Sequence, residues 1–306
     1  MPAAVSILRA NLSLISPVTV TTDSRSVFLQ VRGLRYHVRC WGDPSAPKVF
    51  LLHGFLDTSA TWSDVATALA PRFQVLAPDL RGFGETQWTN TDYWFPDYVG
   101  DFDEIARQLS PDEPLRLAGH SMGAQVASLY AGLRPERVSQ LVILDGLFLP
   151  DMAPELAPKR FRQWLEELRD LPQQKYYKSY EELAGRIRRQ HPQLSDERAL
   201  FVARGWGRKE ADGRLSLCAD PMHRMRGPGL YRAAESLAIW REITAEILFI
   251  DAGKSNFGQV IGKEEKETRR ACFQRRREVV IENAGHMLNF DAPAETAAAI
   301  AAFLVP

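Results

Sequence analysis

Three features are scarce in this sequence of 306 residues: cysteine, long apolar runs, and an excess of charge of either sign. The three cysteines, Cys40, Cys218 and Cys272, are odd in number and lie far apart. This pattern argues against a disulfide framework and against a zinc site, and it favours reduced, mostly buried thiols. We therefore expect a protein of a reducing, cytoplasmic compartment.

The apolar runs are short throughout the chain. None approaches the ~20 residues of a membrane-spanning helix, so we expect no integral membrane segment. The first twenty residues are mildly apolar, but Arg9 and Asn11 interrupt them. A signal peptide needs an apolar stretch of about 7–15 residues, so secretion is the weaker alternative to a cytoplasmic location.

The charges balance, because Lys+Arg and Asp+Glu both total 38. No long-range field attracts nucleic acid, and we expect none as a partner. Hydrophobic residues make up 45% of the chain, which is enough for a large buried core. A small-molecule substrate is the expected partner, and a homodimer stays open.

Short apolar runs alternate with helical patterns over most of the chain. The central runs are continuously apolar, as in strands that are buried on both faces of a parallel sheet. Strands that alternate with helices predict an α/β fold with a mostly parallel, doubly wound sheet. The predicted strands cover residues 27–31, 34–40, 49–52, 74–77, 115–118, 138–144, 246–250 and 278–281, and the predicted helices cover residues 59–69, 98–109, 122–133 and 293–304.

One segment, residues 147–239, shows no obvious strand pattern. Phe161, Leu165 and Leu168 have the spacing of an amphipathic helix. An insertion of roughly ninety residues is too long for an ordinary loop, so we interpret it as a helical cap or lid that follows the sixth strand. The predicted organisation is an N-terminal extension (1–26), a core (27–146 and 240–306) and this cap (147–239).

The motif Gly119-His120-Ser121-Met122-Gly123 fits the pattern G-x-S-x-G. It lies between a predicted strand and a predicted helix, which is the context that this motif requires. The serine of such a turn has a strained backbone, and side chains two residues before and after it would collide, so both positions are glycine. The pattern predicts Ser121 as a nucleophile at the positive end of a helix.

The general base is predicted from its position after the last strand. His286 follows the strand at 278–281, within Glu282-Asn283-Ala284-Gly285-His286. A base that is far from its serine in sequence, and later in the chain, fits the order Ser, acid, His. None of the other five histidines has this position.

Together these residues resemble the α/β-hydrolase superfamily, over nearly the whole chain from about residue 27. Within it, Leu144-Asp145-Gly146-Leu147 resembles the serine-hydrolase-like group. The resemblance implies an α/β-hydrolase fold, a serine hydrolase mechanism, and no metal or organic cofactor. The segments that fall in the family's order are His53-Gly54, Asp79–Gly84, Gly119–Gly123 and Gly285-His286.

The resemblance also implies an oxyanion hole. Its donors would be the backbone N–H groups of Phe55, which follows an apolar strand and His53-Gly54, and of Met122. Such donors contribute about 3–4 kcal/mol each to transition-state stabilisation. We interpret His53 itself as a structural residue that hydrogen-bonds to nearby backbone.

The sequence identifies the acid of the triad less directly than the nucleophile and the base. The family's usual acid follows the seventh strand, where this chain has Asn256, and an amide cannot stabilise an imidazolium as a carboxylate does. Some haloalkane dehalogenases are similar at another point, since they carry their acid after the sixth strand, at the position of Asp145. We predict Asp145 as the acid, with Asp251 and then Asn256 as alternatives. The nucleophile of those enzymes is Asp, so Ser121 argues against dehalogenation and against epoxide hydrolysis through an aspartyl ester.

The insertion offers the clue to the substrate. It holds many large apolar side chains, which either attach it to the core or line an apolar pocket. We expect Trp164, Tyr176 and Phe201, together with Trp94 outside the insertion, to bind substrate. The predicted function is a carboxylesterase-like serine hydrolase that cleaves an ester or thioester with an apolar acyl group. The alternatives are a carbon–carbon bond hydrolase, a cofactor-free haloperoxidase or perhydrolase, and a non-catalytic binding protein on a hydrolase scaffold.

Overall fold

The computed structural model describes residues 24–89 and 91–304. Eight strands form one sheet in the order β1-β2-β4-β3-β5-β6-β10-β11. The β1/β2 and β2/β4 pairs are antiparallel and the other neighbours are parallel. The strands are β1 (Arg25–Val31), β2 (Leu34–Trp41), β3 (Lys48–Leu52), β4 (Gln74–Pro78), β5 (Leu115–His120), β6 (Val138–Leu144), β10 (Glu246–Ala252) and β11 (Arg276–Ile281).

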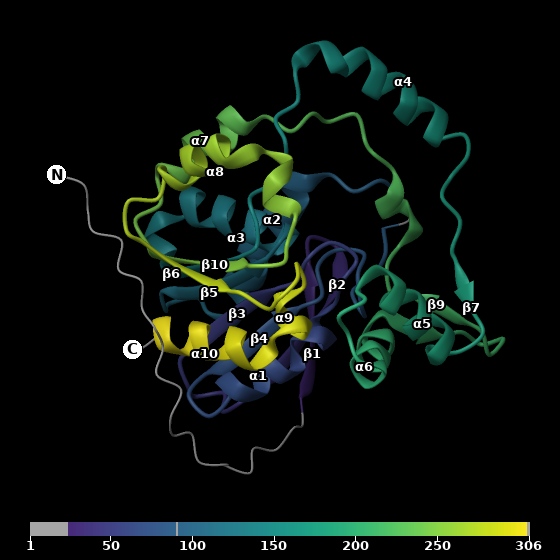
Figure 1. Ribbon diagram of the computed structural model, residues 1–306, viewed down its shortest axis with the longest axis horizontal. Helices are drawn as coiled ribbons and strands as arrows, with labels where there is room; N and C mark the ends of the chain where they lie inside the picture. Colours follow the sequence, from purple (N-terminus) through teal and green to yellow (C-terminus); the bar gives the residue numbers. More distant parts are fainter. Residues whose placement is uncertain (1–23, 90, 305–306) are drawn as a thin grey trace.

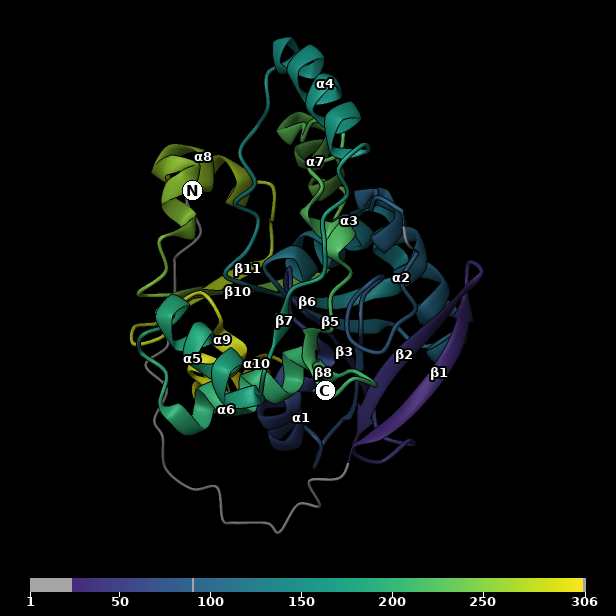
Figure 2. The same ribbon diagram turned by 90° about the vertical axis from the view of Figure 1, so that its right-hand side faces the viewer.

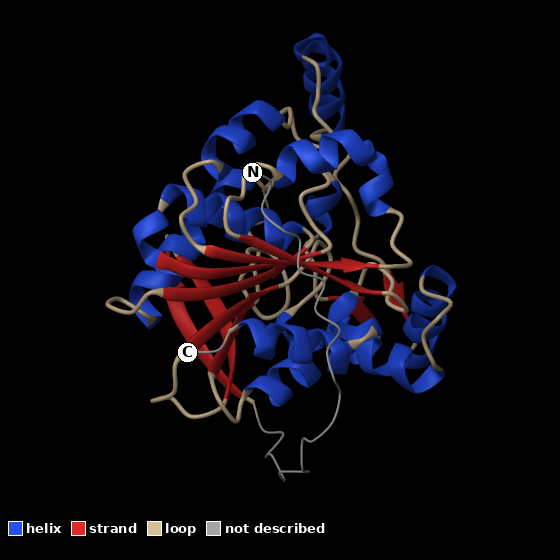
Figure 3. Cartoon of the chain, turned by 60° about the vertical axis from the view of Figure 1, so that its left-hand side comes forward, coloured by secondary structure: helices blue, strands red, loops and turns tan. Residues whose placement is uncertain are grey.

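Helices cover both faces of this sheet, which Figure 3 shows nearly edge-on between two helical layers. Figure 1 shows α1 and α10 below the sheet and α2, α3, α7 and α8 above it. The helices that lie outside the insertion or pack on the faces of the sheet are η1 (Ser59–Trp62), α1 (Ser63–Leu69), α2 (Phe95–Leu109), α3 (Met122–Leu133), η2 (Pro135–Arg137), α7 (Ala233–Trp240), η5 (Phe257–Val260), α8 (Gly262–Arg270), α9 (Leu288–Asp291) and α10 (Pro293–Phe303).

The predicted α/β sheet is confirmed, and all eight predicted strands are present within a few residues of their expected bounds. Strands β3 to β6 are buried along nearly their whole length, as their continuously apolar sequences require. Each face of the sheet packs on its own apolar cluster, one with Trp240 and Phe102 at its centre, the other with Trp62. This two-sided core fixes the ends of the parallel strands, where the predicted site residues lie.

The sequence predicted a helical insertion between β6 and β10. The insertion is not purely helical. Besides helices it contains a three-stranded antiparallel sheet, β7-β9-β8, whose strands are only two or three residues long. Its last helix, α7, packs against α3, and Trp240 is fully buried in the core. The elements of the insertion before α7 are η3 (Pro154–Leu156), α4 (Ala157–Glu167), β7 (Tyr176–Tyr177), α5 (Tyr180–Gln190), α6 (Asp196–Trp206), β8 (Gly207–Lys209), β9 (Leu215–Leu217) and η4 (Pro221–Arg224).

Two parts of the insertion differ in their packing. Helix α4 has no buried residue and extends away from the body of the molecule (Figure 2). Helices α5 and α6 instead share an apolar cluster that also includes Met287 and Phe290, just after His286. The insertion is thereby attached to the loop that carries the predicted base.

The predicted N-terminal extension is largely outside the part of the chain that the structure describes. Residues 1–23 of the predicted N-terminal extension lie outside the described residues, and β1 begins at Arg25. Across residues 24–89 and 91–304, no helix has both the length and the apolar composition to span a bilayer.

Candidate active site

Ser121 lies at the sharp turn between β5 and α3. Its backbone has φ 51° and ψ −111°, a strained conformation for a residue with a side chain. A Cβ on Gly119 would come within 2.4 Å of the Gly123 carbonyl oxygen, and one on Gly123 within 2.2 Å of the Leu52 oxygen. The two glycines therefore let the turn close, as the motif predicted, and the Ser121 side chain is left half-buried at the N-terminus of α3.

The structure brings His286 and Asp145 together from positions far apart in sequence. His286 Nδ1 is 2.7 Å from Asp145 Oδ2, and the side chains are 14% and 4% exposed. Asp145 directly follows β6, and its backbone N–H donates to the Ile250 carbonyl at 2.9 Å. The backbone N–H of Ala252 reaches the other carboxylate oxygen of Asp145 at 3.5 Å. Asp145 is thus held at the carboxyl ends of β6 and β10, facing the imidazole.

Neither alternative acid contacts His286. Asp251 forms ion pairs with Arg270, at 2.6 Å, and with Lys266, at 2.9 Å. Asn256 is exposed, and its side-chain oxygen accepts a hydrogen bond from Gln259 at 3.1 Å. Of the three candidates that the sequence left open, Asp145 is therefore the one whose position suits an orienting carboxylate.

The two predicted oxyanion donors are free within the described part of the chain. The backbone N–H groups of Phe55 and Met122 make no hydrogen bond there. The loop that carries Phe55 lies against the turn at Ser121, since a Cβ on Gly54 would be 3.3 Å from the Ser121 Cβ. Two unpaired N–H groups beside one serine hydroxyl are suited to binding a developing oxyanion.

His53 fixes the peptide that presents one of these donors. Its Nε2 accepts the Leu80 N–H at 2.9 Å, so its Nδ1 carries the proton and donates to the Gly54 carbonyl at 2.8 Å. The Asp57 N–H donates to the same carbonyl at 3.3 Å. Because a trans peptide holds its C=O and N–H on opposite sides, this leaves the Phe55 N–H facing away from His53. His53 has the structural position that we expected of it.

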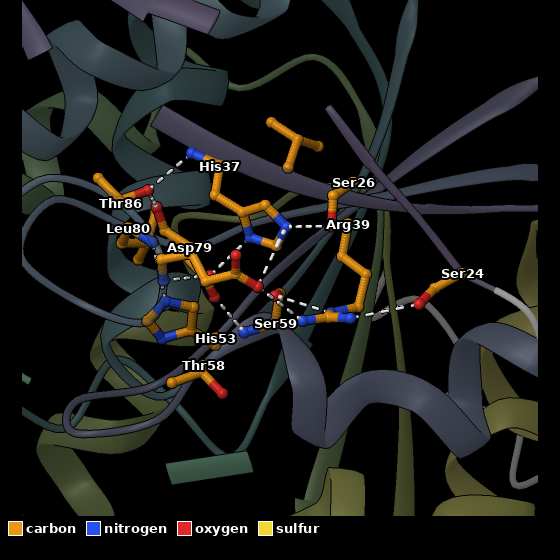
Figure 4. Close-up of polar contacts among 12 residues, drawn as sticks. Ser24, Ser26, His37, Arg39, His53, Thr58, Ser59, Asp79, Leu80 and Thr86 are labelled. Atoms are coloured by element: carbon orange, nitrogen blue, oxygen red, sulfur yellow. Dashed lines mark hydrogen bonds and ion pairs between the residues drawn. The ribbon is translucent and has the colours of Figure 1, made fainter. Parts of the chain in front are cut away.

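A buried polar network around Asp79 lies next to His53 (Figure 4). Asp79 is 2.7 Å from His37 Nδ1 and accepts the Ser59 backbone N–H at 2.6 Å. Burial alone would raise the pKa of Asp79, but the hydrogen bond with His37, the electrostatic effects of His37 and His53 and the Glu85 N–H together outweigh it, so the pKa is lowered. Thr86 Oγ1 also donates to the Asp79 carbonyl at 2.6 Å. The loop after β4 is therefore a rigid support for His53.

Ser121 and His286 do not hydrogen-bond to each other among the described residues, but the residue before Ser121 contacts His286. The ring of His120, next to Ser121, lies 4.7 Å from the ring of His286, and its Nε2 is 2.7 Å from the His286 carbonyl oxygen. The His286 ring makes no hydrogen bond to Ser121 among the described residues. Catalytic hydrogen bonds are often long without substrate, and the pairing of Ser121 with His286 stays a prediction.

Sequence reasoning missed Phe257, which stacks on the His286 imidazole. The ring centroids are 3.9 Å apart with planes 19° apart, and Phe257 is 51% exposed. It directly follows Asn256, in the loop where the family's usual acid would stand. The only signal in the sequence was this adjacency. The loop therefore covers one face of the base with an aromatic ring.

Sequence reasoning also missed Asp57, which connects the loop of Phe55 to the insertion. Its fully buried carboxylate accepts hydrogen bonds from Trp206 Nε1 at 2.7 Å, Thr61 Oγ1 at 2.7 Å and Asn289 Nδ2 at 3.1 Å. Burial raises the pKa of Asp57. Trp206 ends α6 and Asn289 lies in α9, after His286. One carboxylate thus joins the loop of Phe55, the insertion and the loop of His286.

The four predicted substrate-binding side chains are not brought together. Trp164, on α4, donates its Nε1 proton to Asp92 at 3.0 Å. Arginine side chains lie over the rings of Tyr176 and Phe201, at 3.8 Å and 4.4 Å. Trp94 is 57% exposed before α2. None of the four contacts Ser121 or His286 through a hydrogen bond or ring contact, so their role stays a prediction.

No metal site accompanies this arrangement in the part of the chain that the structure describes. No group of three or more His, Cys, Asp or Glu side chains there has a geometry that could hold a metal ion. Cys40 and Cys272 are buried, and burial raises the pKa of the Cys40 thiol to about 11. The polar groups around Ser121 are those of acid–base and nucleophilic chemistry.

Comparison with solved structures shows similarity along nearly the whole chain. The thioesterase domain from the curacin biosynthetic pathway superposes with a TM-score of 0.78 at 27% sequence identity, covering 91% of this chain and 99% of that domain. The hypothetical protein PA1622 from Pseudomonas aeruginosa PAO1 gives 0.79 at 25% identity, covering 91% and 97%. Both superpositions extend over nearly the whole of these neighbours, so they share the fold of this chain.

Curated relatives match over a shorter stretch. Epoxide hydrolase 2 from Siraitia grosvenorii is 36% identical over 124 residues, which are 40% of this chain and 38% of that protein. The first relatives found, such as the uncharacterized protein Rv2715 of Mycobacterium tuberculosis, are likewise matched over 37% of their length. The pattern of the alpha/beta hydrolase family, in contrast, matches residues 49–299. That match spans β3 to α10, with Ser121, Asp145 and His286 inside it, and the chain belongs to the alpha/beta hydrolase family.

Proposed function

We propose that this hydrolase is a serine hydrolase that cleaves a carboxylic ester or thioester with an apolar acyl group through an acyl-enzyme. The observation that carries the proposal is the Asp145–His286 hydrogen bond of 2.7 Å beside the strained turn at Ser121. Orienting acid, base and nucleophile then come from the ends of β6, β11 and β5. This is the set of groups that acyl transfer needs.

The reaction follows from these positions. Ser121 Oγ attacks the acyl carbonyl carbon while His286 Nε2 takes the hydroxyl proton, and the carbonyl oxygen becomes an oxyanion held by the Phe55 and Met122 N–H groups. The bond to the leaving group breaks as His286 returns the proton to its oxygen or sulfur atom. Water then loses a proton to His286 and attacks the acyl-enzyme, releasing the acid and the Ser121 hydroxyl. Asp145 stabilises the imidazolium in both halves.

The apolar acyl preference rests on two half-exposed rings. Phe55 is 48% exposed at the oxyanion loop, and Phe257 is 51% exposed on the face of His286. Leu56 and Val260 add further exposed apolar surface in the same two loops. Large apolar side chains this exposed beside polar reacting groups favour an apolar ligand. The structural likeness to a thioesterase domain makes thioesters the first alternative to oxygen esters.

Epoxide hydrolysis fits these residues less well, despite the sequence similarity to an epoxide hydrolase. Opening an epoxide with the Ser121 hydroxyl would leave an ether, which water does not cleave readily. An aspartyl ester, in contrast, is hydrolysed at its carbonyl carbon. The serine at the elbow therefore supports acyl transfer.

The first test is turnover and covalent labelling of the serine. We expect wild-type protein to hydrolyse nitrophenyl esters, to prefer longer acyl chains over acetate, and to be labelled by a fluorophosphonate. Ser121→Ala should lose both activities, because it removes the attacking oxygen. Ser139→Ala is the matched control, since Ser139 lies on β6 with its hydroxyl bonded to the Leu115 carbonyl. A labelled Ser121→Ala, or an unlabelled wild type without turnover, would refute the proposal and favour a binding protein.

A further inference from the structure

The edge of the large sheet at β11 is open within the described residues. β11 pairs with β10 on one side, and no described strand pairs with its other side. Figure 2 shows β10 and β11 at the end of the sheet away from β1 and β2. The strand contains no proline or lysine, and Val280 is 50% exposed. An edge strand whose backbone groups are open can pair with another strand, although three of the six residues of β11 are charged.

The residues of β11 that face the open edge can be identified. The carbonyls of Arg275 and Ile281 accept hydrogen bonds from β10 and from the residue just after it. The backbone groups of the odd-numbered residues therefore point toward β10. Backbone groups alternate along a strand, which leaves those of Arg276, Glu278 and Val280 pointing outward. A second strand can bond to these even-numbered positions without disturbing β10.

An apolar groove lies beside this edge. It has a volume of about 430 Å³ and is formed by β11 and α10. Ala298, Ala299 and Ala302 line its helical side, and Val279 and Val280 line its strand side. Arg277 and Glu295 are also among its lining residues. An occupant must therefore offer small apolar side chains and charges of both signs.

We propose that the occupant is a second copy of this chain, paired antiparallel through β11 about a two-fold axis at Val279. A two-fold axis perpendicular to a sheet keeps side chains on their own faces, so it must pass through a residue position. With Val279 on the axis, Arg276 lies opposite Glu282 of the second copy, and Glu278 lies opposite Val280. The Glu278–Val280 pair uses outward-pointing residues of β11, and Glu282 lies in the turn that directly follows the strand.

The charges of β11 favour this register over its neighbours. An axis at Val280 would place Glu278 opposite Glu282, and an axis at Glu278 would place that residue opposite itself. Like charges directly opposite each other destabilise strand pairs, whereas opposite charges stabilise them. Of these three axes, the one at Val279 matches Arg276 with Glu282 and avoids both clashes. Glu282 is exposed, and Arg276 already lies 3.1 Å from Glu278 on the same face.

A second complementary pair arises on the other face. Arg277 lies near the end of α10, with its guanidinium 6.0 Å from the Phe303 ring, whereas Glu295 is in the first turn of α10. The two-fold axis reverses this order. It brings Arg277 toward the Glu295 end of the second copy, and it sets the two alanine-lined helix faces side by side. The edge is thus complementary to itself on both faces.

The first experiment measures the mass of the full chain by light scattering. We expect twice the 34.5 kDa of one chain at concentrations of about 10 µM and above. Arg276→Glu and Glu282→Arg should each raise the dimer dissociation constant by about tenfold or more, and the double variant should restore it to within about threefold. A monomeric wild type, or a dimer unaffected by the single variants, would overturn the proposal.

The second experiment tests the register independently of charge. In an antiparallel non-hydrogen-bonded pair the Cα atoms are about 4.5 Å apart, so Val279→Cys should form a disulfide with its own copy under mild oxidation. Val280→Cys is the matched control, because its copies would lie beyond the roughly 7 Å limit for a disulfide. A covalent dimer with Val279→Cys supports the axis. Cross-linking through position 280 instead, or through neither, would rule it out.

Discussion

At the scale of single residues, the structure distinguishes between two positions for the predicted acid, one in or after β10 and one after β6. The usual place after β10 holds Asn256, and the neighbouring Asp251 is already neutralised by Arg270 and Lys266. Asp145 instead faces His286, with its backbone in a left-handed conformation at φ 39°. This conformation is uncommon for a residue with a side chain. The chain therefore tolerates backbone strain at two of its three proposed catalytic residues, Ser121 and Asp145.

Replacing this carboxylate should have a large effect on rate and little effect elsewhere. Asp145→Asn keeps the shape of the side chain but cannot hold His286 in the tautomer that accepts the Ser121 proton. We expect kcat for nitrophenyl esters to fall on the order of 10⁴-fold. Asn256→Asp, which alters an exposed residue in the loop of the usual acid, is the matched control and should change kcat by less than about threefold. If Asp145→Asn retained near-normal turnover, the acid would have to be assigned elsewhere.

Sequence could predict the residues of the site that depend on local pattern, and it missed those that depend on tertiary contact. The turn at Ser121 and the position of His286 follow from strand, turn and helix signals within a few residues. The stacking of Phe257 on His286 depends on how two loops meet, and nothing in its own neighbourhood specifies that. The same holds for Asp57, whose partners Trp206 and Asn289 come from distant segments.

At the scale of elements, the strands were predictable because burial on both faces leaves continuous apolar sequence. Helix α8 was not, since its sequence, GKEEKETRR, has no apolar stripe. Its buried face is made of Arg269 and Arg270, whose charges are paired with Glu265 and with Asp251. Hydrophobic periodicity cannot detect a helix that buries arginine stems. Strands β7, β8 and β9 were too short to leave a pattern.

The contact between α6 and the loop of Phe55 can be tested by removing one hydrogen-bond donor, the Trp206 Nε1–H. Trp206→Phe removes the N–H that donates to the buried Asp57 carboxylate and keeps a ring next to Phe290. A hydrogen bond to a charged group contributes about 1.5–3 kcal/mol, so we expect the free energy of unfolding in urea to fall by that amount. We also expect a reduced kcat, because Asp57 ends the loop that carries Phe55.

A second tryptophan supplies the control for this change. Trp164 also donates to a carboxylate, Asp92, but from the largely exposed helix α4. Trp164→Phe should lower the free energy of unfolding by less than about 0.5 kcal/mol and leave kcat unchanged. Equal losses in the two variants would show that the bond between Trp206 and Asp57 has no special role in joining the insertion to the core.

At the scale of the whole molecule, the insertion and the core meet around a buried histidine. His223 of η4 is stacked between Phe83, at 3.8 Å, and Tyr93, at 3.7 Å, while Phe55 lies 6.1 Å away. Phe83 and Tyr93 belong to the core, so this stack holds the insertion close to the oxyanion loop. Burial lowers the pKa of His223 to about 3. The folded state therefore keeps this side chain neutral at pH values where the unfolded chain protonates it.

Because the pKa of His223 is lower in the folded than in the unfolded state, it sets the direction in which stability changes with pH. Between the unfolded pKa of about 6.5 and the folded value, the unfolded state binds the extra proton, so stability is lost as the pH falls. From about pH 7 to about pH 5 this one histidine should cost about 2 kcal/mol of the free energy of unfolding.

His223→Phe keeps an aromatic ring between Phe83 and Tyr93 but cannot take up a proton. Its unfolding free energy, measured in urea at both pH values, should therefore fall by about 2 kcal/mol less than that of the wild type. Other titrating groups, such as the buried His120, are common to both proteins and cancel in the comparison. Parallel pH profiles for the two proteins would mean that His223 is accessible to protons in the folded state, and that the insertion is not closed over the loop of Phe55.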